Sequence, residues 1–122
     1  MQVEVVSAES ELFSGEANEV YARSLDGEIG ILPGHQPALL ALDIAPVRIK
    51  HEGGVEVFAV HHGFLYFRDN HLVILADIAE RASDIDAARA QAELQSLQGD
   101  DSDEARTASR RAEVRVQVAR AD

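Results

Sequence analysis

Asp86 and Arg89 are a carboxylate and a guanidinium three residues apart, a pair that could take part in ligand binding. An arginine makes charge-assisted hydrogen bonds to phosphate, and a nearby carboxylate accepts hydrogen bonds from ribose hydroxyls or an adenine amine. The same spacing is that of an ordinary ion pair near a helix N-terminus, which stabilises a helix only slightly. The pair itself therefore leaves a nucleotide site and a structural ion pair both open.

The histidines indicate neither a metal site nor a catalytic site. His61 and His62 are adjacent, so in a strand their rings point to opposite faces and do not readily ligate one metal ion. His51 and His71 fall in predicted turns without a histidine–carboxylate constellation around them. The sequence also has no glycine-rich phosphate loop with a lysine and no nucleophile–base arrangement. We therefore expect a chain that holds no metal and is not an enzyme.

Length and composition predict a small protein with a thin core. A chain of 122 residues forms one compact domain, or a small domain with an appendage. Its six aromatic residues include no tryptophan, so the core must be mostly aliphatic. No apolar stretch is long enough to cross a membrane. The first residues lack the pattern of a signal peptide and there is no cysteine, which together favour a cytoplasmic location.

The charges are distributed unevenly along the chain. The net charge of −11 excludes a nucleic-acid-binding protein, because there is no excess of cations to neutralise phosphates. Residues 1–83 hold 13 acidic and 5 basic side chains. Residues 105–122 instead hold five arginines against Glu113 and Asp122. We expect the two ends of the chain to have different roles.

Residues 1–82 show the two-residue period of β-strands. Apolar and polar residues alternate in Val3–Val5, Val47–Ile49 and Val55–Val60. Turn-forming residues at 51–54 and 68–71 separate such runs. Many short strands with no helical period between them predict an antiparallel β-sandwich, or flattened barrel, over residues 1–82.

The period changes to that of helices in residues 83–122. A first helix is expected from about Ile85 to Gln98, with Ser83 or Asp84 as its N-cap. Gly99 and Asp100 should end it. Its apolar stripe consists of Ala87, Ala90, Leu94 and Leu97.

A second helix should follow at once and complete an antiparallel hairpin. Asp101 and Glu104 have the spacing of a capping box, and the turn between the helices is short. Its apolar stripe consists of Ala105, Ala108, Ala112, Val116 and Ala119. Small side chains bury little area, at about 25 cal/mol per Å², so we expect the hairpin to be held weakly. Weak docking is what a moving part requires.

Residues 26–40, DGEIGILPGHQPALL, closely resemble the loop-and-strand signature of the epsilon subunits of bacterial F-type ATP synthases. Further matching segments occur in the family's order over residues 3–77, and the predicted hairpin follows where the family places it. They are residues 5–9, 12–15, 63–65 and 70–77. One departure is Ala45, which stands where the family usually has glycine and concerns the local turn.

The resemblance implies a non-catalytic rotor subunit. The sandwich would bind the gamma subunit of the central stalk and sit on the c-ring, coupling ion-driven rotation to ATP synthesis. The hairpin would be a regulator with a compact and an extended state that inhibits ATP hydrolysis. The chain would lie at the cytoplasmic face of the cell membrane as a peripheral part of the complex, with either H⁺ or Na⁺ as coupling ion.

The central motif should form a rigid surface loop. Its glycines permit tight backbone paths, and Pro33 and Pro37 fix their own φ angles. From the residues alone, this is a simple connection between strands. From the resemblance, it is the end of the sandwich that meets the polar loops of the c-ring, with Glu28 and His35 at the contact.

The resemblance also implies two sites on the hairpin. Ile85, Asp86, Arg89 and Ala90 match a motif that resembles the ATP-binding element of several family members, assisted there by positions equivalent to Glu80, Arg111 and Arg115. The first helix is shorter than is common, and a further arginine would lie in the missing stretch. We expect ATP to be at most a weak regulatory ligand, with the ordinary ion pair as the competing interpretation, and expect no other cofactor.

The second hairpin site is basic. Arg106, Arg110, Arg111 and Arg115 would contact an acidic surface of the alpha and beta catalytic subunits, or else form a solvated basic face. Two other functions remain open from the sequence. One is a free-standing ATP-sensing domain, and the other is a β-sandwich ligand-binding module unrelated to the synthase.

Overall fold

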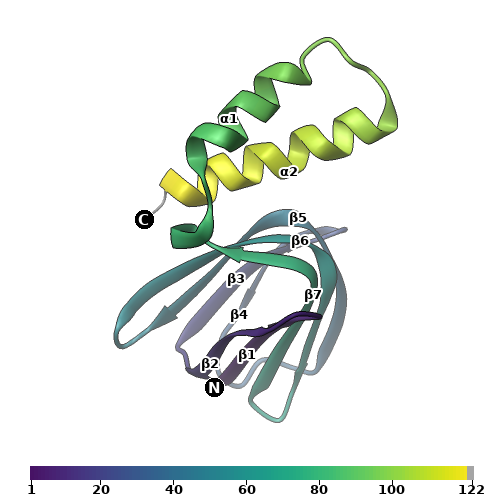
Figure 1. Cartoon of the computed structure of the whole chain (residues 1–122). Coiled ribbons are helices and arrows are strands. Elements are labelled where there is room, and N and C mark those ends of the chain that lie inside the picture. Colours follow the sequence, from purple (N-terminus) through teal and green to yellow (C-terminus); the bar gives the residue numbers. More distant parts are fainter. Residues whose placement is uncertain (121–122) are drawn as a thin grey trace.

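The computed structural model describes residues 1–120, a curled β-sheet with two helices lying across one side of it (Figure 1). The strands are β1 (Gln2–Ser7), β2 (Glu11–Glu16), β3 (Glu19–Ser24), β4 (Gly27–Ile31), β5 (Ala38–His51), β6 (Gly54–Arg68) and β7 (His71–Arg81). They are followed by the 3-10 helix η1 (Ala82–Asp84) and the helices α1 (Ala87–Ser96) and α2 (Asp103–Arg120). The predicted sandwich followed by a helical hairpin is confirmed.

The strands form one sheet in the order β2-β1-β7-β6-β5-β3-β4. All neighbouring strands are antiparallel except β1 and β7, which run parallel from the pair Gln2 and His71 to the pair Ser7 and Ala76. The sheet is thus antiparallel, as predicted, except at this one pair, which the sequence analysis did not anticipate. The cause is topological, because the first strand inserts beside the last one and not beside a strand that is joined to it by a hairpin.

Two long strands let this single sheet form both layers. β5 pairs with β6 over nearly its whole length, with Leu42 opposite Gly63 and Ile44 opposite His61. Between these pairs β6 bends, where His62 has a φ of 64° and Gly63 a φ of 137°. The sheet curls around a core that is mostly aliphatic, as predicted from composition, and Phe58 and Phe67 are its largest side chains.

Helix α1 begins at Ala87, two residues later than the sequence suggested. Its N-cap is Asp86, whose Oδ1 accepts a hydrogen bond from the Arg89 N–H at 3.0 Å. Ser83 and Asp84 lie instead in η1, so the prediction that one of them caps the helix is wrong. The reason is the extended backbone at Ile85 (φ −95°, ψ 127°), which separates η1 from α1.

Helix α2 is likewise capped by a residue other than the predicted one. Ser102 Oγ accepts a hydrogen bond from the Ala105 N–H at 3.1 Å, and the Ser102 carbonyl accepts the first helical bond from Arg106. Asp101 is therefore not the N-cap. The turn between the helices contains Gly99, whose φ of 86° suits glycine at a helix end.

Helix α2 has two apolar faces, although the sequence analysis identified one. The predicted stripe is buried or half-buried, and its Val116 shares a cleft with Leu94 of α1. A second face carries Val114 and Val118, which pack on the sheet as described below. The hairpin is therefore in a compact state, folded against the sandwich (Figure 1).

Candidate functional site

A cleft of about 290 Å³ lies where the end of β7 meets η1, α1 and α2. Its lining consists of Glu80, Asp84, Ile85, Asp86, Arg89, Ala90, Glu93 and Arg115. Six of the seven residues that were predicted to bind a nucleotide are thus brought together. The seventh, Arg111, lines a neighbouring cleft of about 480 Å³, which shares Glu93 and Arg115 with the first.

The charges around this cleft oppose an anionic ligand. Four carboxylates face it, against the guanidinium groups of Arg89 and Arg115. One carboxylate, Asp86, is already the cap of α1, and no ion pair joins it to the Arg89 side chain in residues 1–120. Like charges at close range repel the phosphates of a nucleotide. The geometry suits the predicted site, whereas the electrostatics do not favour it.

Glu80 is the carboxylate of the cleft that accepts two side-chain hydrogen bonds. Its Oε1 accepts hydrogen bonds from His61 Nε2 at 2.7 Å and from Arg115 Nε at 2.9 Å. The hydrogen bond from His61 lowers the pKa of Glu80 most, and Arg115 lowers it further, although partial burial acts in the opposite direction. Glu80 is therefore held as a carboxylate between the sheet and α2.

His61 is a functional candidate that the sequence analysis missed. Its side chain is fully buried, and it lies on the same side of β6 as Ala59, which packs against α2. The sequence analysis weighed His61 only as a metal ligand. The useful signal was the period of two, which puts residues 57, 59 and 61 on one face of the strand.

A second ion pair joins the hairpin to the sheet. Arg110 Nη2 lies 2.5 Å from Asp43 Oδ1, and the same oxygen accepts a hydrogen bond from the Ile44 N–H at 2.8 Å. Burial raises the pKa of Asp43, but the hydrogen bonds from Arg110 and Ile44 outweigh it, so that the pKa is lowered overall. This contact joins residues far apart in the sequence, and no local pattern predicts it.

The four arginines assigned to a catalytic-subunit contact therefore differ in their surroundings. Arg110 and Arg115 are paired with carboxylates of the sandwich. Arg106 is exposed to solvent. Arg111 is half-buried in the cleft beside Glu93. In this state, two of the four are engaged within the chain itself.

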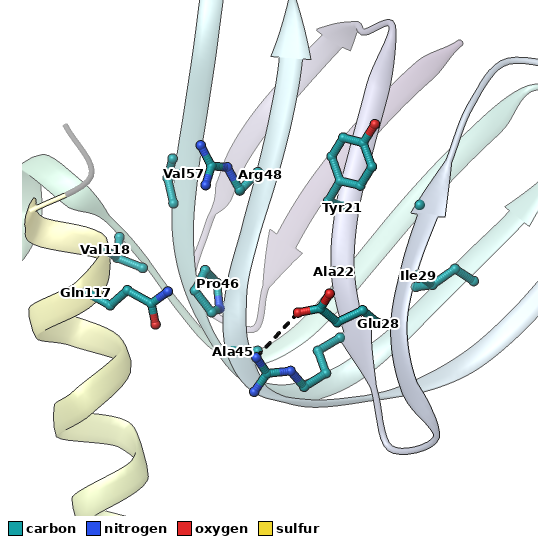
Figure 2. A pocket seen from close by; sticks show the side chains of 12 residues that line it. Tyr21, Ala22, Glu28, Ile29, Ala45, Pro46, Arg48, Val57, Gln117 and Val118 are labelled. Carbon is teal, nitrogen blue, oxygen red and sulfur yellow. Dashed lines mark ion pairs between the residues drawn. The ribbon is translucent and has the colours of Figure 1, made fainter.

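Glu28 and His35 do not lie in one cluster. Glu28 lines a cleft of about 470 Å³ between β3, β4, β5 and the end of α2, where it pairs with Arg23 at 3.7 Å (Figure 2). His35 lies in the loop between β4 and β5, and its ring makes a T-shaped contact with the ring of Phe67, with 5.8 Å between the ring centroids. In the same loop, the Gly34 N–H donates a hydrogen bond to Asn70 Oδ1 at 2.7 Å.

Residues 1–120 contain no group of three or more histidine, cysteine or acidic side chains placed to hold a metal ion. Within the same residues, neither α1 nor α2 is both long and apolar enough to span a membrane.

The sandwich defines the class of protein. Residues 1–82 match the family model described as "ATP synthase, Delta/Epsilon chain, beta-sandwich domain". The chain is 46% identical over 119 residues to the ATP synthase epsilon chain of Streptomyces avermitilis, covering 97% of this chain and 94% of that one. It is 52% identical over 93 residues to the epsilon chain of Brevibacillus brevis, covering 75% and 70%. The chain belongs to the family of ATP synthase epsilon chains, which are subunits of the complex that synthesises ATP.

Two solved structures share the fold over nearly the whole of this chain. A chain of the Euglena gracilis mitochondrial ATP synthase structure, described as OSCP/F1/c-ring, superposes with a TM-score of 0.78 at 18% identity, covering 98% of this chain and 78% of that one. A chain of the Tetrahymena thermophila mitochondrial ATP synthase central stalk and c-ring superposes with a TM-score of 0.63 at 16% identity, covering 96% and 91%. At these identities the likeness concerns the fold.

Proposed function

We propose that this epsilon chain is a non-catalytic rotor subunit of the central stalk, which couples ion-driven rotation of the c-ring to ATP synthesis. Its hairpin inhibits ATP hydrolysis when it leaves the sandwich and reaches the catalytic subunits. The subunit lies at the cytoplasmic face of the cell membrane, attached there through the complex. The family and the fold support the rotor role, and the contacts of α2 support the regulatory role.

An exposed apolar face of the sheet supports a stable partner. Leu39 and Tyr66 are opposite each other on β5 and β6, and Phe64 and Leu75 are opposite each other on β6 and β7. Leu39 is 67% exposed and Phe64 is 54% exposed. Adjacent exposed apolar and aromatic side chains are typical of protein interfaces. We assign this face to the gamma subunit, and assign Glu28 and His35 to the polar loops of the c-ring.

The observation that carries the regulatory role is the pairing of two hairpin arginines with the sandwich. Arg110 and Arg115 are bound to Asp43 and Glu80 in the compact state. If the hairpin extends, both guanidinium groups become available for an acidic surface on the alpha and beta subunits. The compact state thus withholds the groups that the extended state would use.

Removal of the hairpin tests this role. Membranes whose ATP synthase carries a chain that lacks residues 84–122 should still synthesise ATP, because the sandwich remains. Their ATP hydrolysis should rise several-fold relative to membranes with the full chain. Unchanged hydrolysis in an assembled complex would contradict an inhibitory hairpin, and loss of assembly would contradict a sandwich that is sufficient for rotor binding.

ATP sensing is the second candidate function. The cleft that gathers six of the predicted nucleotide-binding residues supports it, and the excess of carboxylates around that cleft opposes it. Isothermal titration of the full chain with ATP separates the two candidates. Absence of heat at millimolar ATP would reject the sensor and leave the rotor function intact. Saturable binding that is lost in Arg89→Ala would establish the sensor.

A further inference from the structure

Helix α2 rests on the sandwich through a small apolar contact. Val114 and Val118 meet Ile44 and Ala59, and a few partly buried side chains border them. Because the apolar area is limited to these short side chains, its burial stabilises the docked helix only modestly. Other interactions must therefore decide how firmly the hairpin is held.

Two carboxylates of the sandwich flank this contact. Asp43 on β5 binds Arg110, and Glu80 on β7 binds Arg115. In the sheet β6 lies between β5 and β7, so the two ion pairs hold α2 on both sides of the strand that carries Ala59. The side chains of Glu80 and Arg115 are 28% and 24% exposed, so this pair is better shielded from water than an ordinary surface pair, whereas Arg110 of the other pair is 48% exposed.

Both carboxylates are held in place by the sandwich itself. Glu80 Oε1 is bound by His61 Nε2, from a side chain that is fully buried. Asp43 Oδ1 is bound by the Ile44 N–H at the bend of the sheet. An acceptor that is already oriented loses little conformational freedom when its arginine arrives. The sandwich therefore presents a preformed site to α2.

We propose that Asp43 and Glu80 form an acidic latch for the hairpin, with His61 as the residue that positions Glu80. This proposal rests on the proposed regulatory function. The latch occupies the arginines that an acidic surface of the catalytic subunits would take, so the two sites compete for the same groups. The strength of the latch then sets the fraction of hairpin in the extended state, because a two-state equilibrium follows the difference in binding free energy between its states.

Neutral variants of equal shape weaken the latch without disturbing the fold. Asp43→Asn still offers an oxygen to the Ile44 N–H, and Glu80→Gln still offers one to His61. Each variant removes the charge that its arginine requires. We expect Glu80→Gln to raise the ratio of released to docked hairpin about tenfold, Asp43→Asn to raise it less because Arg110 is half-exposed, and the double variant to raise it most.

The isolated full chain allows a direct measurement of docking. The chain contains no cysteine, so Glu52→Cys in the turn before β6 and Gln98→Cys in the hairpin turn can be spin-labelled selectively. Pulsed electron–electron double resonance measures the distance between the two labels and so reports the fractions of docked and released hairpin. Asp69→Asn, an exposed residue in the turn between β6 and β7, is a matched control that should leave the populations unchanged.

Charge exchange and a conservative variant test the latch and its positioning residue separately. Asp43→Arg should release the hairpin, and the added Arg110→Asp should restore docking. The docked fraction of the hairpin should be larger in His61→Gln, which keeps a hydrogen-bond donor for Glu80, than in His61→Leu. The two variants should unfold at similar urea concentrations. Unchanged populations in Asp43→Asn and Glu80→Gln would overturn the latch. Equal docking of the two His61 variants would overturn the role of His61.

A second readout in the complex keeps the latch distinct from the proposed function. Reconstituted ATP synthase with the double variant Asp43→Asn, Glu80→Gln should hydrolyse ATP more slowly than the complex with the unaltered chain. If the hairpin is released in the isolated chain but hydrolysis is unchanged, the latch stands and the inhibitory function is rejected. If the spin-label populations are unchanged, the latch is rejected whatever the rate of hydrolysis.

Discussion

Gly63 and Leu75 approach so closely across β6 and β7 that no side chain fits between them. A Cβ atom on Gly63 would lie 2.1 Å from the Leu75 carbonyl oxygen and 2.8 Å from Ala76 Cα. Both are backbone atoms of the neighbouring strand, so neither can move aside cheaply. This contact, together with the φ of 137° at Gly63, fixes the bend that lets one sheet form two layers.

The first prediction concerns this bend. Gly63→Ala should lower the free energy of unfolding by about 2–4 kcal/mol, because it adds a steric clash to an unfavourable φ. Urea unfolding followed by circular dichroism measures the change. Gly54→Ala is the matched control, since Gly54 has a φ of 132° but has open space around its Cβ position. An equal loss in both variants would show that φ alone, and not the contact with Leu75, requires glycine.

The second prediction concerns the cap of α1. Asp86→Ala should destabilise the helix by about 1 kcal/mol, because the Arg89 N–H loses its acceptor. Hydrogen exchange of amides in α1 should accelerate, while exchange in the sheet stays the same. Asp84→Ala should have a much smaller effect, since Asp84 makes no cap for α1. A larger effect of Asp84→Ala than of Asp86→Ala would instead support Asp84 as the N-cap, as the sequence suggested.

The third prediction concerns pH. In the docked state Arg110 lowers the pKa of Asp43 against the effect of burial, and Arg115 lowers the pKa of Glu80 beyond the larger effect of His61. His61 and the Ile44 N–H belong to the sandwich and remain when the hairpin leaves, so only the two arginine contributions make each ionised carboxylate stabilise docking. That contribution is fully present above the ordinary carboxyl pKa and is lost as the pH falls through the lowered pKa. Docking should thus be constant near neutral pH and should weaken below about pH 4. Spin-label distances recorded from pH 7 to pH 3 measure this.

The double variant Asp43→Asn, Glu80→Gln provides the control for the pH series. It has lost both titrating groups, so its released fraction should be higher at neutral pH and should change less on acidification. If the docked fraction falls equally in both proteins on acidification, carboxylates other than Asp43 and Glu80 cause the acid sensitivity.

The fourth prediction concerns the apolar part of the docking contact. Val118→Ala should weaken docking by about 1–2 kcal/mol, because Val118 is completely buried against the sheet. Exchange of α2 amides measures this loss. Val55→Ala removes the same atoms from a side chain that is 48% exposed and should have little effect. A similar acceleration in both variants would indicate a general loss of stability.

Local patterns in the sequence predict the two halves of the fold but not how they meet. The alternation in Val55–Val60 and the helical stripe through Ala90 and Leu94 each depend on neighbours in sequence, and the strand and the helix that they predict are confirmed. The single buried face expected for this strand is wrong, since Phe58 and Val60 lie in the sandwich core and Ala59 is buried against α2. The parallel pairing of β1 with β7 depends on the order in which distant strands assemble, which no short pattern carries. The bend at His62 also departs from the regular strand period.

The same distinction applies to the candidate site. The motif residues around Asp86 and Arg89 line one cleft because they are close together in the sequence, and nucleotide binding there stays a prediction. The acidic latch joins Asp43 to Arg110 and Glu80 to Arg115 across long stretches of chain, and only the tertiary structure reveals it. Val114 and Val118 were missed although their four-residue spacing is helical, since the longer alanine-rich stripe hid a second one.

The parallel pairing of β1 with β7 is the pairing that requires the longest loop closure in the sheet. Closing the sheet brings Gln2 opposite His71 and so closes a long loop of chain. The entropy lost in closing this loop must be offset before the pairing adds stability. The helices form from local contacts and need no such closure. The surface on which α2 docks includes Ile44 and Ala59, and it forms only after β5 and β6 have paired. The hairpin should therefore dock only after β5 and β6 have paired, and its small apolar contact should make it detach first under mild denaturing conditions.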